Sequence, residues 1–387
     1  MRYKHFQNAN VDASVLAVGT WALGNFGYGD VNEKDSIDAI HAMFDGGVNL
    51  IDTAPIYGAG HSEEVVGRAL KGLDRSKILL ATKFGSGGTT LATHVMRALP
   101  IGFPKVIATT QACSDKLPGF ISGKDIIVIN SVVDVSGLNS IISHVYDEAA
   151  GAVVGAALAY TPHPADKPRI AISMYGITTP CVVHAAKYLE TRGYEPIIFH
   201  ANGAGGKAMK TLIAEGMFQG VLDITTAEVG AYVLDAESSS AGEDRLDAAV
   251  LAGLPQVVSV GGMDVIGIRV DQLHTKFQGY KPYSHNDKPD MIRTRPEDGI
   301  RIGQFMCRHL NNSIAPCAIY LPIRSLSSLD VAGGQTCDDE ARRLLYESIS
   351  QNAGPAVDVV EMDCDINAPA FAEAMAERLC RMLEAKK

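Results

Sequence analysis

The chain has no apolar run long enough to cross a bilayer. Of its 387 residues, 47% are hydrophobic and 20% are charged, which is ordinary for a soluble globular protein. The most apolar stretch, residues 149–160, is too short and too rich in glycine and alanine to span a membrane. The N-terminal residues contain no apolar signal core. We therefore expect a cytoplasmic protein with no membrane-bound part.

The chain also lacks a basic charge balance and any cysteine motif. Its net charge of −10 argues against a nucleic-acid-binding surface. The seven cysteines include no Cys-x-x-Cys pair and no spacing typical of a metal site. We expect scattered, reduced thiols and no metal centre.

Strand-like and helix-like runs alternate along almost the whole chain, a pattern typical of parallel sheets with crossover helices. Residues 161–168 contain three prolines, which cannot continue a helix or a central strand, so this stretch is the best candidate for a linker. The sequence predicts two tandem open α/β domains of the Rossmann-like type, with mainly parallel sheets, and not a complete TIM barrel. The first domain consists of residues 1–85 and 86–165, and the second of residues 169–387.

Two glycine-rich turns each follow a predicted strand and open a predicted helix. In such a turn, backbone N–H groups and the helix dipole can face an anion. Neither turn is a strict dinucleotide fingerprint or a P-loop, and a tight βα turn explains either one equally well. Together they favour a phosphate-bearing ligand. The candidate phosphate-binding residues are Gly85, Ser86, Gly87, Gly88 and Thr89 in the first turn, and Gly203, Gly205, Gly206 and Lys207 in the second.

Further polar residues follow other predicted strands, where ligands of open parallel sheets bind. Some have plain structural alternatives: Thr179 suits a helix N-cap before Pro180, Asp264 a solvated turn, and the loop around His285 a solvated surface. The candidate cofactor-binding residues here are Asp134, Asn139, Thr178, Thr179 and Asp264. The candidate residues for an anionic substrate are His285, Arg293 and Arg324.

From residue 85 onward the chain resembles the ATP-binding domain family of the tomato mosaic virus resistance protein and its bacterial relatives. The segments that carry this resemblance are residues 85–89, 131–139, 175–181, 200–207, 222–226, 285–293, 321–330 and 363–371. The resemblance implies two tandem α/β subdomains that bind ATP, with or without Mg²⁺, near the first. The family's own first stretch of residues is not recognisable upstream of residue 85.

Residues 1–85 instead resemble the beginning of an aldo-keto reductase, through Gly19-Thr20-Trp21, residues 52–58 and residues 81–85. That resemblance implies a catalytic tetrad, of which Asp52, Tyr57 and Lys83 match three members. No histidine follows the next predicted strand, and the late phosphate-binding signatures of that family are missing. We therefore expect Asp52, Tyr57 and Lys83 to be relics, and NADPH not to be a cofactor. A gene fusion, a misassembled gene or a constructed chimera would each explain the junction.

The sequence thus predicts an ATP- or nucleotide-binding α/β protein of unassigned reaction. A regulatory role, with a protein partner or a second copy of the chain, is the second hypothesis. Residual aldo-keto reductase activity of the N-terminal segment is the third. We expect residues 1–85 to be built into the first α/β domain, because their apolar strands would otherwise leave unpaired edges.

Overall fold

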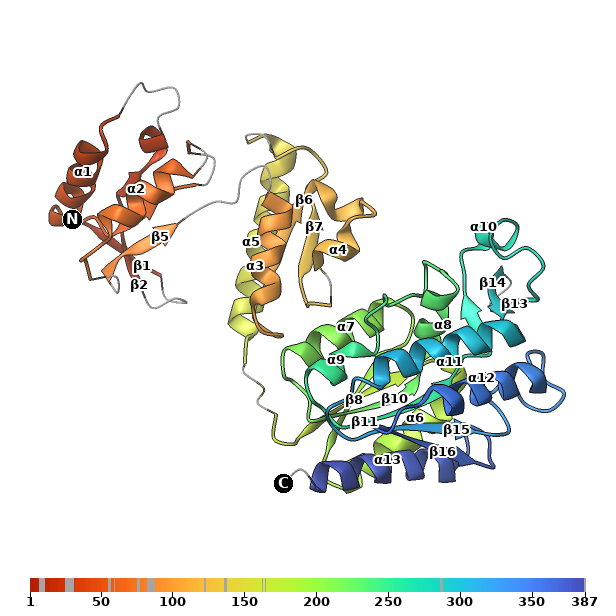
Figure 1. Ribbon diagram of the computed structural model, residues 1–387. Coiled ribbons are helices and arrows are strands. Elements are labelled where there is room, and N and C mark those ends of the chain that lie inside the picture. The colour runs from red at the N-terminus through yellow and green to blue at the C-terminus, as the bar shows by residue number, and fades with distance from the viewer. Residues whose placement is uncertain are drawn as a thin grey trace. The chain divides into compact units, whose positions relative to one another are not determined.

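The computed structural model divides the chain into two units, Met1–Pro162 and His163–Lys387 (Figure 1). The residues that the structure describes are 1–6, 11–24, 31–54, 57–58, 60–74, 77–81, 88–121, 123–135, 138–161, 163, 165–285 and 288–385. The predicted linker, residues 161–168, contains the boundary between the units.

The first unit begins with an antiparallel pair of strands, β1 (Tyr3–Phe6) and β2 (Val11–Ser14). A three-stranded parallel sheet follows, formed by β3 (Ala17–Gly19), β4 (Leu50–Asp52) and β5 (Leu79–Ala81). Its crossover helices are α1 (Glu33–Asp45) and α2 (His61–Ala69). Their buried side chains, such as Ile40 and Val66, pack with Ile51 of the central strand. Apolar side chains at helical spacing thus cover this small sheet.

The rest of the first unit contains a second, two-stranded parallel sheet. Its elements are α3 (Gly88–Ala98), β6 (Val106–Thr109), α4 (Leu117–Ile121), β7 (Ile127–Asn130) and α5 (Ser140–Ala159). Helix α5 extends well beyond the helix predicted over 138–150, because the small apolar residues that follow continue it. The described strands of residues 1–81 and of residues 88–161 form separate sheets. A core shared between residues 1–85 and 86–165 stays a prediction.

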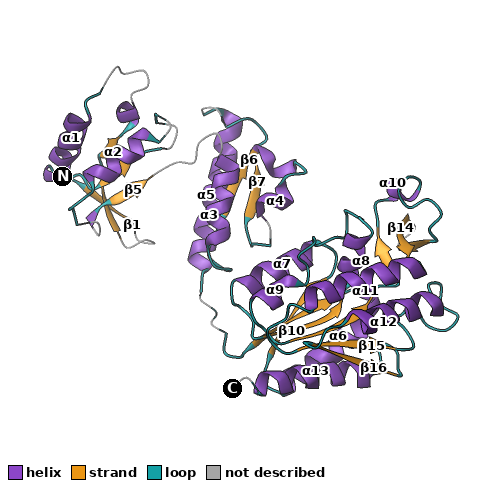
Figure 2. Cartoon of the chain, viewed as in Figure 1, coloured by secondary structure: helices purple, strands orange, loops and turns teal. Residues whose placement is uncertain are grey.

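The second unit is built on a six-stranded parallel sheet with the order β16-β15-β11-β10-β8-β9 (Figures 1 and 2). These strands are β8 (Arg169–Met174), β9 (Glu195–His200), β10 (Gly220–Thr225), β11 (Gln256–Gly261), β15 (Cys317–Pro322) and β16 (Val357–Met362). Every residue of β10, β11 and β15 is buried, as expected for the centre of a parallel sheet.

Helices cover both faces of this sheet. On one face lie α6 (Thr179–Thr191) and α13 (Pro369–Glu384), which pack on alternate strand residues such as Ile172 and Leu222. The other face carries α7 (Ala204–Ala214), α8 (Ala227–Val233), α9 (Asp247–Leu251), α11 (Pro296–Leu310) and α12 (Asp339–Asn352). This arrangement confirms the predicted open α/β class, and the described residues form no closed barrel.

Residues 261–295, between β11 and α11, also contain regular structure. A small antiparallel sheet has the order β12-β14-β13, from β12 (Val265–Gly267), β13 (Pro282–His285) and β14 (Lys288–Arg293), and α10 (Val270–Leu273) lies between its strands in sequence. The three strands are short, and β13 and β14 contain prolines and polar residues, so their sequences show little period-two alternation.

No described helix is long and apolar enough to cross a membrane. All seven cysteines are unbridged. Burial raises the pKa of Cys181 to about 12 and those of Cys307 and Cys317 to about 11, so these three thiols are protonated at neutral pH.

Candidate ligand-binding edge of the large sheet

The order of the large sheet defines where a ligand would bind. Numbered along the chain, its strands lie in the order 2-1-3-4-5-6, since β9 lies on one side of β8 and β10 on the other. The chain adds β9 on one side of β8 and then adds β10 on the other side, so the order in which strands are added reverses between β8 and β10. In open α/β sheets, ligands bind beyond the carboxyl ends of the strands at such a switch point. The residues that follow β8 and β10 are the first candidates.

Two threonine hydroxyls meet at this switch point. Thr178 Oγ1, in the turn after β8, lies 2.7 Å from Thr225 Oγ1 at the end of β10, and neither residue is exposed to solvent. Thr178 Oγ1 also lies 3.0 Å from the carbonyl oxygen of Tyr175, to which it can donate. Thr179, the first residue of α6, donates to the same carbonyl at 3.2 Å. The two predicted threonines thus fix the turn that begins α6.

The turn after β8 is held by the loops that follow β15 and β16. The carbonyl oxygen of Ile177 accepts the N–H of Ser328 at 3.0 Å and the side-chain amide of Asn367 at 3.0 Å. The Asn367 side chain also accepts the N–H of Cys181 at 3.3 Å. Gly262 N–H, after β11, donates to the carbonyl of Leu326 at 2.8 Å. The loops at this edge are therefore interlocked, which preorganises the switch point.

The predicted glycine turn after β9 already holds an anion, the carboxylate of Glu228. Glu228 Oε1 accepts the N–H of Gly203 at 2.5 Å and that of Gly206 at 3.1 Å. A Cβ on Gly206 would lie 2.2 Å from this carboxylate, so only glycine allows the approach. Gly203 has φ +87° at the start of α7, and Gly205 donates to Asn202 at 3.2 Å. The N–H groups of this turn thus face a carboxylate of the chain itself, and phosphate binding there stays a prediction.

The side chain of Arg245 extends this contact into a buried network. Its Nε lies 2.6 Å from Glu228 Oε2, and its two terminal nitrogens lie 2.7 and 2.9 Å from the two carboxylate oxygens of Asp223. Ser173 Oγ donates to Asp223 at 2.5 Å and accepts the N–H of Thr225 at 2.8 Å. All three charged residues are at most 3% exposed. The network ties β8, β10 and the glycine turn together next to the switch point.

Asp264, the predicted ligand residue after β11, is completely buried. Its Oδ2 accepts hydrogen bonds from Ser327 at 2.7 Å and Thr336 at 2.8 Å, while its Oδ1 has no partner among the described residues. Burial, and then the charge of Asp330, raise the pKa of Asp264 to about 6. Asp264 is therefore a buried, hydrogen-bonded residue, and the alternative of a solvated turn aspartate is wrong.

Arg293 lies against the same cluster and is 6% exposed. One of its nitrogens donates to Thr294 Oγ1 at 2.6 Å, and another lies 3.9 Å from Asp330. Asp330 in turn pairs with Arg342 at 2.6 Å. Arg293 therefore serves a buried charge cluster rather than the surface loop that its sequence neighbours suggested.

Two further predicted residues of the second unit, Lys207 and Arg324, lie on the surface. Lys207 is exposed in the first turn of α7. Arg324 makes a two-pronged ion pair with Asp363, at 3.0 and 3.2 Å, beyond the ends of β15 and β16. His285 ends β13, and its side chain lies outside what the structure describes.

In the first unit, the two predicted polar residues after β7 have local roles. Asn139 caps α5 by accepting the N–H groups of Ile141 and Ile142, both at 3.0 Å. Asp134 accepts the N–H of Val135 at 2.8 Å and is exposed. These contacts are typical of a helix cap and a polar turn.

The first glycine turn can be described only at its end. Gly85, Ser86 and Gly87 lie outside the described residues, and Gly88 begins α3. Thr89 Oγ1 lies 2.7 Å from Thr109 Oγ1 at the end of β6. A hydroxyl pair thus joins a helix N-terminus to a strand end here, as Thr178 and Thr225 do in the second unit.

The aldo-keto reductase residues are only partly described. Asp52 ends β4, and its carbonyl accepts the N–H of Thr20 at 3.0 Å. The Tyr57 ring lies 5.2 Å from the ring of Trp21. Lys83 lies outside the described residues. A tyrosine–lysine–aspartate arrangement stays a prediction.

Sequence reasoning missed Asp223, Glu228 and Arg245. One signal could have found the first of them. Asp223 interrupts an otherwise apolar strand, and a carboxylate in a buried strand needs a charged or hydrogen-bonding partner. The identity of that partner, Arg245, depends on the fold and not on local sequence.

The fold and this edge define an open, doubly wound α/β protein with a polar switch point. The chain belongs to the uncharacterised protein family UPF0261, whose C-terminal domain model matches residues 167–383 and whose N-terminal domain model matches residues 64–162. The aldo/keto reductase family model matches residues 15–99. The two families therefore overlap over residues 64–99, and the UPF0261 match begins upstream of the change of family expected at residue 85.

Named relatives of the chain come from bacteria and a plant. A UPF0261 protein of Clostridium tetani is 35% identical over 92% of this chain and 90% of its own length. One from Mesorhizobium japonicum is 37% identical over 76% of this chain and 74% of its own length. The ToMV resistance protein Tm-1(GCR237) of Solanum lycopersicum is 33% identical over 76% of this chain, but this match spans only 40% of that protein.

Proposed function

We propose that the protein binds a nucleotide, with ATP as the first candidate, at the switch point of the large sheet. The observation that carries this proposal is the contact between Thr178 and Thr225, which lies between β8 and β10 where the strand order reverses. The N-terminus of α6 begins at the same turn, and a helix N-terminus favours the negative charge of a phosphate. The exposed backbone at Gly176 suits a phosphate-bearing ligand, and the buried Thr178–Thr225 contact holds this turn in place.

The contacts of the second glycine turn refine this proposal. Because Glu228 occupies the N–H groups of Gly203 and Gly206, a phosphate there would have to displace a buried carboxylate from Arg245. The turn of residues 175–179 needs no such displacement. Gly176 is exposed, and nothing lies within 4 Å of the position that a Cβ would take there. Binding a phosphate beside Gly176 therefore costs less free energy than binding one at the glycine turn after β9. The first glycine turn, residues 85–89, belongs to the first unit and stays a separate proposed phosphate site.

Isothermal titration of the full chain with ATP and Mg²⁺ tests whether a nucleotide binds. Saturable heat, together with a rise in thermal unfolding temperature, is expected. Replacing Gly87 and Gly88 by valine should weaken binding if the first turn contacts phosphate. Unchanged affinity in that variant would show that the nucleotide does not bind at the first turn.

A regulatory role is the second candidate function. It is motivated by the relative that is named a ToMV resistance protein. In the present chain, a nucleotide would then tune the binding of a partner protein. Product formation distinguishes an enzyme from a regulatory protein. Steady release of ADP from the full chain would favour an enzyme, whereas tight binding of ATP without product would favour regulation.

A further inference from the structure

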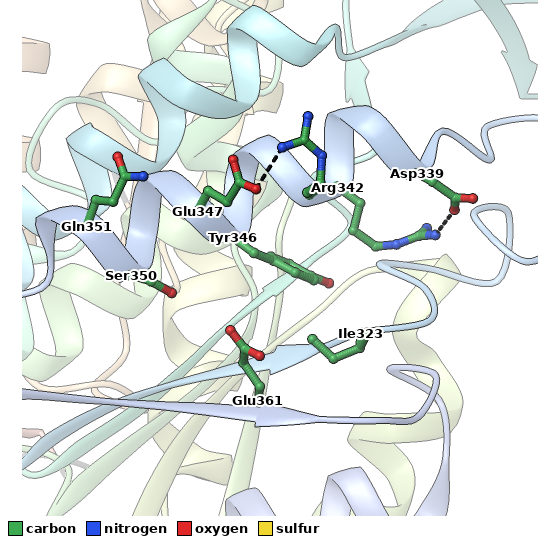
Figure 3. Close-up of a pocket in the computed structure, with 9 residues that line it drawn as sticks. Ile323, Asp339, Arg342, Tyr346, Glu347, Ser350, Gln351 and Glu361 are labelled. Carbon is green, nitrogen blue, oxygen red and sulfur yellow. Dashed lines mark hydrogen bonds and ion pairs between the residues drawn. The ribbon is translucent and has the colours of Figure 1, made fainter.

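A groove with a volume of about 500 Å³ lies between helix α12 and strand β16, at an edge of the large sheet. Most of its lining comes from α12, with Ile323 and Glu361 contributed from the ends of β15 and β16 (Figure 3). The Glu361 side chain points from the strand toward Tyr346 and Ser350 on the helix. This groove lies on the α12 face of the sheet and is distinct from the switch point.

After the ion pairs of the groove are counted, the charge that remains unpaired among its described residues is negative. Its two arginines have carboxylate partners, since Arg342 pairs with Asp330 and Asp339, and Arg343 pairs with Glu347 at 2.7 Å. Glu361 is exposed and forms no ion pair with any residue that the structure describes. It lies beside the ring of Tyr346, whose hydroxyl donates to the carbonyl of Pro322. An uncompensated carboxylate next to an aromatic ring suits a cationic side chain.

The backbone of β16 is available next to the same groove. Within the described residues, β16 pairs in its sheet with β15 alone. The Met362 carbonyl accepts the N–H of Ile323 at 2.9 Å, so the backbone groups of Met362 point toward β15. Because these groups alternate along a strand, those of Val359 and Glu361 point toward the open edge, as does the carbonyl of Val357, whose N–H donates to Gly354 at 3.1 Å. An unpaired edge of this kind can accept a further strand.

We propose that this edge binds an extended basic segment of a partner protein, which adds a strand to β16 and places a lysine or arginine against Glu361. Main-chain pairing would supply affinity, and the groove would supply specificity for the basic side chain. A second copy of this chain fits less well. Its own β16 contains two acidic residues, Asp358 and Glu361, and no lysine or arginine, so a second β16 would bring no cation to Glu361.

Fluorescence anisotropy with the full chain tests this proposal. The probe is a labelled peptide of about eight residues that alternates threonine and valine and carries one central lysine. We expect saturable binding, and binding at least about tenfold weaker when glutamate replaces the lysine. The Glu361→Lys variant should reverse this preference. The Glu384→Lys variant, an exposed charge reversal on α13 away from the groove, should not.

Val359→Pro tests the strand pairing itself, since it removes an N–H from the open edge and none from the ladder with β15. It should abolish peptide binding. A lysine peptide that is N-methylated at alternate positions makes the same test without changing the protein, and it should not bind. Equal binding of lysine and glutamate peptides, binding that survives N-methylation, or no binding at millimolar peptide would each overturn the proposal. So would self-association of the chain that is lost in Val359→Pro, because a second copy would then occupy the edge.

Discussion

The carboxylate of Glu228 lies 2.6 Å from the Arg245 guanidinium and at the same time accepts two N–H groups of the glycine turn after β9. A turn with the geometry of a phosphate site is thereby filled by a side chain from the following helix, α8. Since Asp223 neutralises the remaining face of Arg245, the network is satisfied without a ligand. This turn therefore shapes the edge of the sheet, and the proposed ligand lies at the neighbouring switch point.

Removing the Glu228 carboxylate should destabilise the second unit. In Glu228→Ala, Arg245 Nε and the N–H groups of Gly203 and Gly206 would lose their acceptor in a buried site. We expect a loss of about 3–5 kcal/mol in the free energy of unfolding, measured by urea titration with circular dichroism. Glu228→Gln should lose less, because one acceptor oxygen remains. Glu340→Ala, at an exposed position on α12, is the matched control and should change stability by less than about 0.5 kcal/mol. Equal stability of Glu228→Ala and wild type would show that the network does not hold the turn.

The buried Asp264 should make stability depend on pH. Its pKa in the folded chain is about 6, above the value of about 3.9 in an unfolded chain. The folded state therefore binds the proton more tightly, so this contribution to stability is full below about pH 4 and is lost as pH rises through 6. Asp264→Asn keeps an acceptor for Ser327 and Thr336 but has no charge to bury.

Relative to wild type, the Asp264→Asn variant should thus gain stability between pH 4 and pH 7.5, by on the order of 3 kcal/mol. Urea titrations of both proteins across this range measure the difference. If the two stability curves run parallel, Asp264 does not titrate as the structure indicates.

Carbonyl reduction by the N-terminal segment should be undetectable. A lysine lowers the pKa of a tyrosine only when a fold holds the two within hydrogen-bonding reach, and the described residues form no closed barrel that would do so. Oxidation of NADPH with a panel of aldehydes is the assay. A rate that disappears in Tyr57→Phe would place the chemistry in residues 1–85 and overturn this expectation.

The central sheet could be predicted from sequence because its signals are local. Residues 221–224 are apolar apart from Asp223 and are bounded by turn residues, and Thr179-Pro180 is a strong helix start. The sequence therefore predicts a strand over 221–224 and a helix over 181–192, within a few residues of the observed β10 and α6. The contact between Thr178 and Thr225 joins residues 47 positions apart, and the local sequence around either residue does not indicate this contact. Only the strand order brings them together.

The anion that the second glycine turn holds could not be predicted, for the same reason. Glycines at 203, 205 and 206 specify a turn that can hold an anion, and that part of the interpretation follows from backbone geometry. Which anion fills it depends on where α8 places Glu228, and that depends on tertiary packing. The exposed or buried state of Asp264 and Arg293 was equally beyond local sequence, because short strands around them gave no clear period.

The affinity of ATP with Mg²⁺ for Gly176→Val, measured by isothermal titration beside wild type, tests the central claim most directly. Gly176 has open space at its Cβ position, so valine should leave the fold intact while it fills the entrance to the α6 N-terminus. Gly151→Val on α5, also with open space at its Cβ, is the matched control. The account predicts saturable binding to wild type and the control, and binding at least about tenfold weaker to Gly176→Val. Equal affinity of all three proteins would move the site away from the switch point. Absence of both heat and thermal shift in wild type at millimolar nucleotide would contradict nucleotide binding altogether.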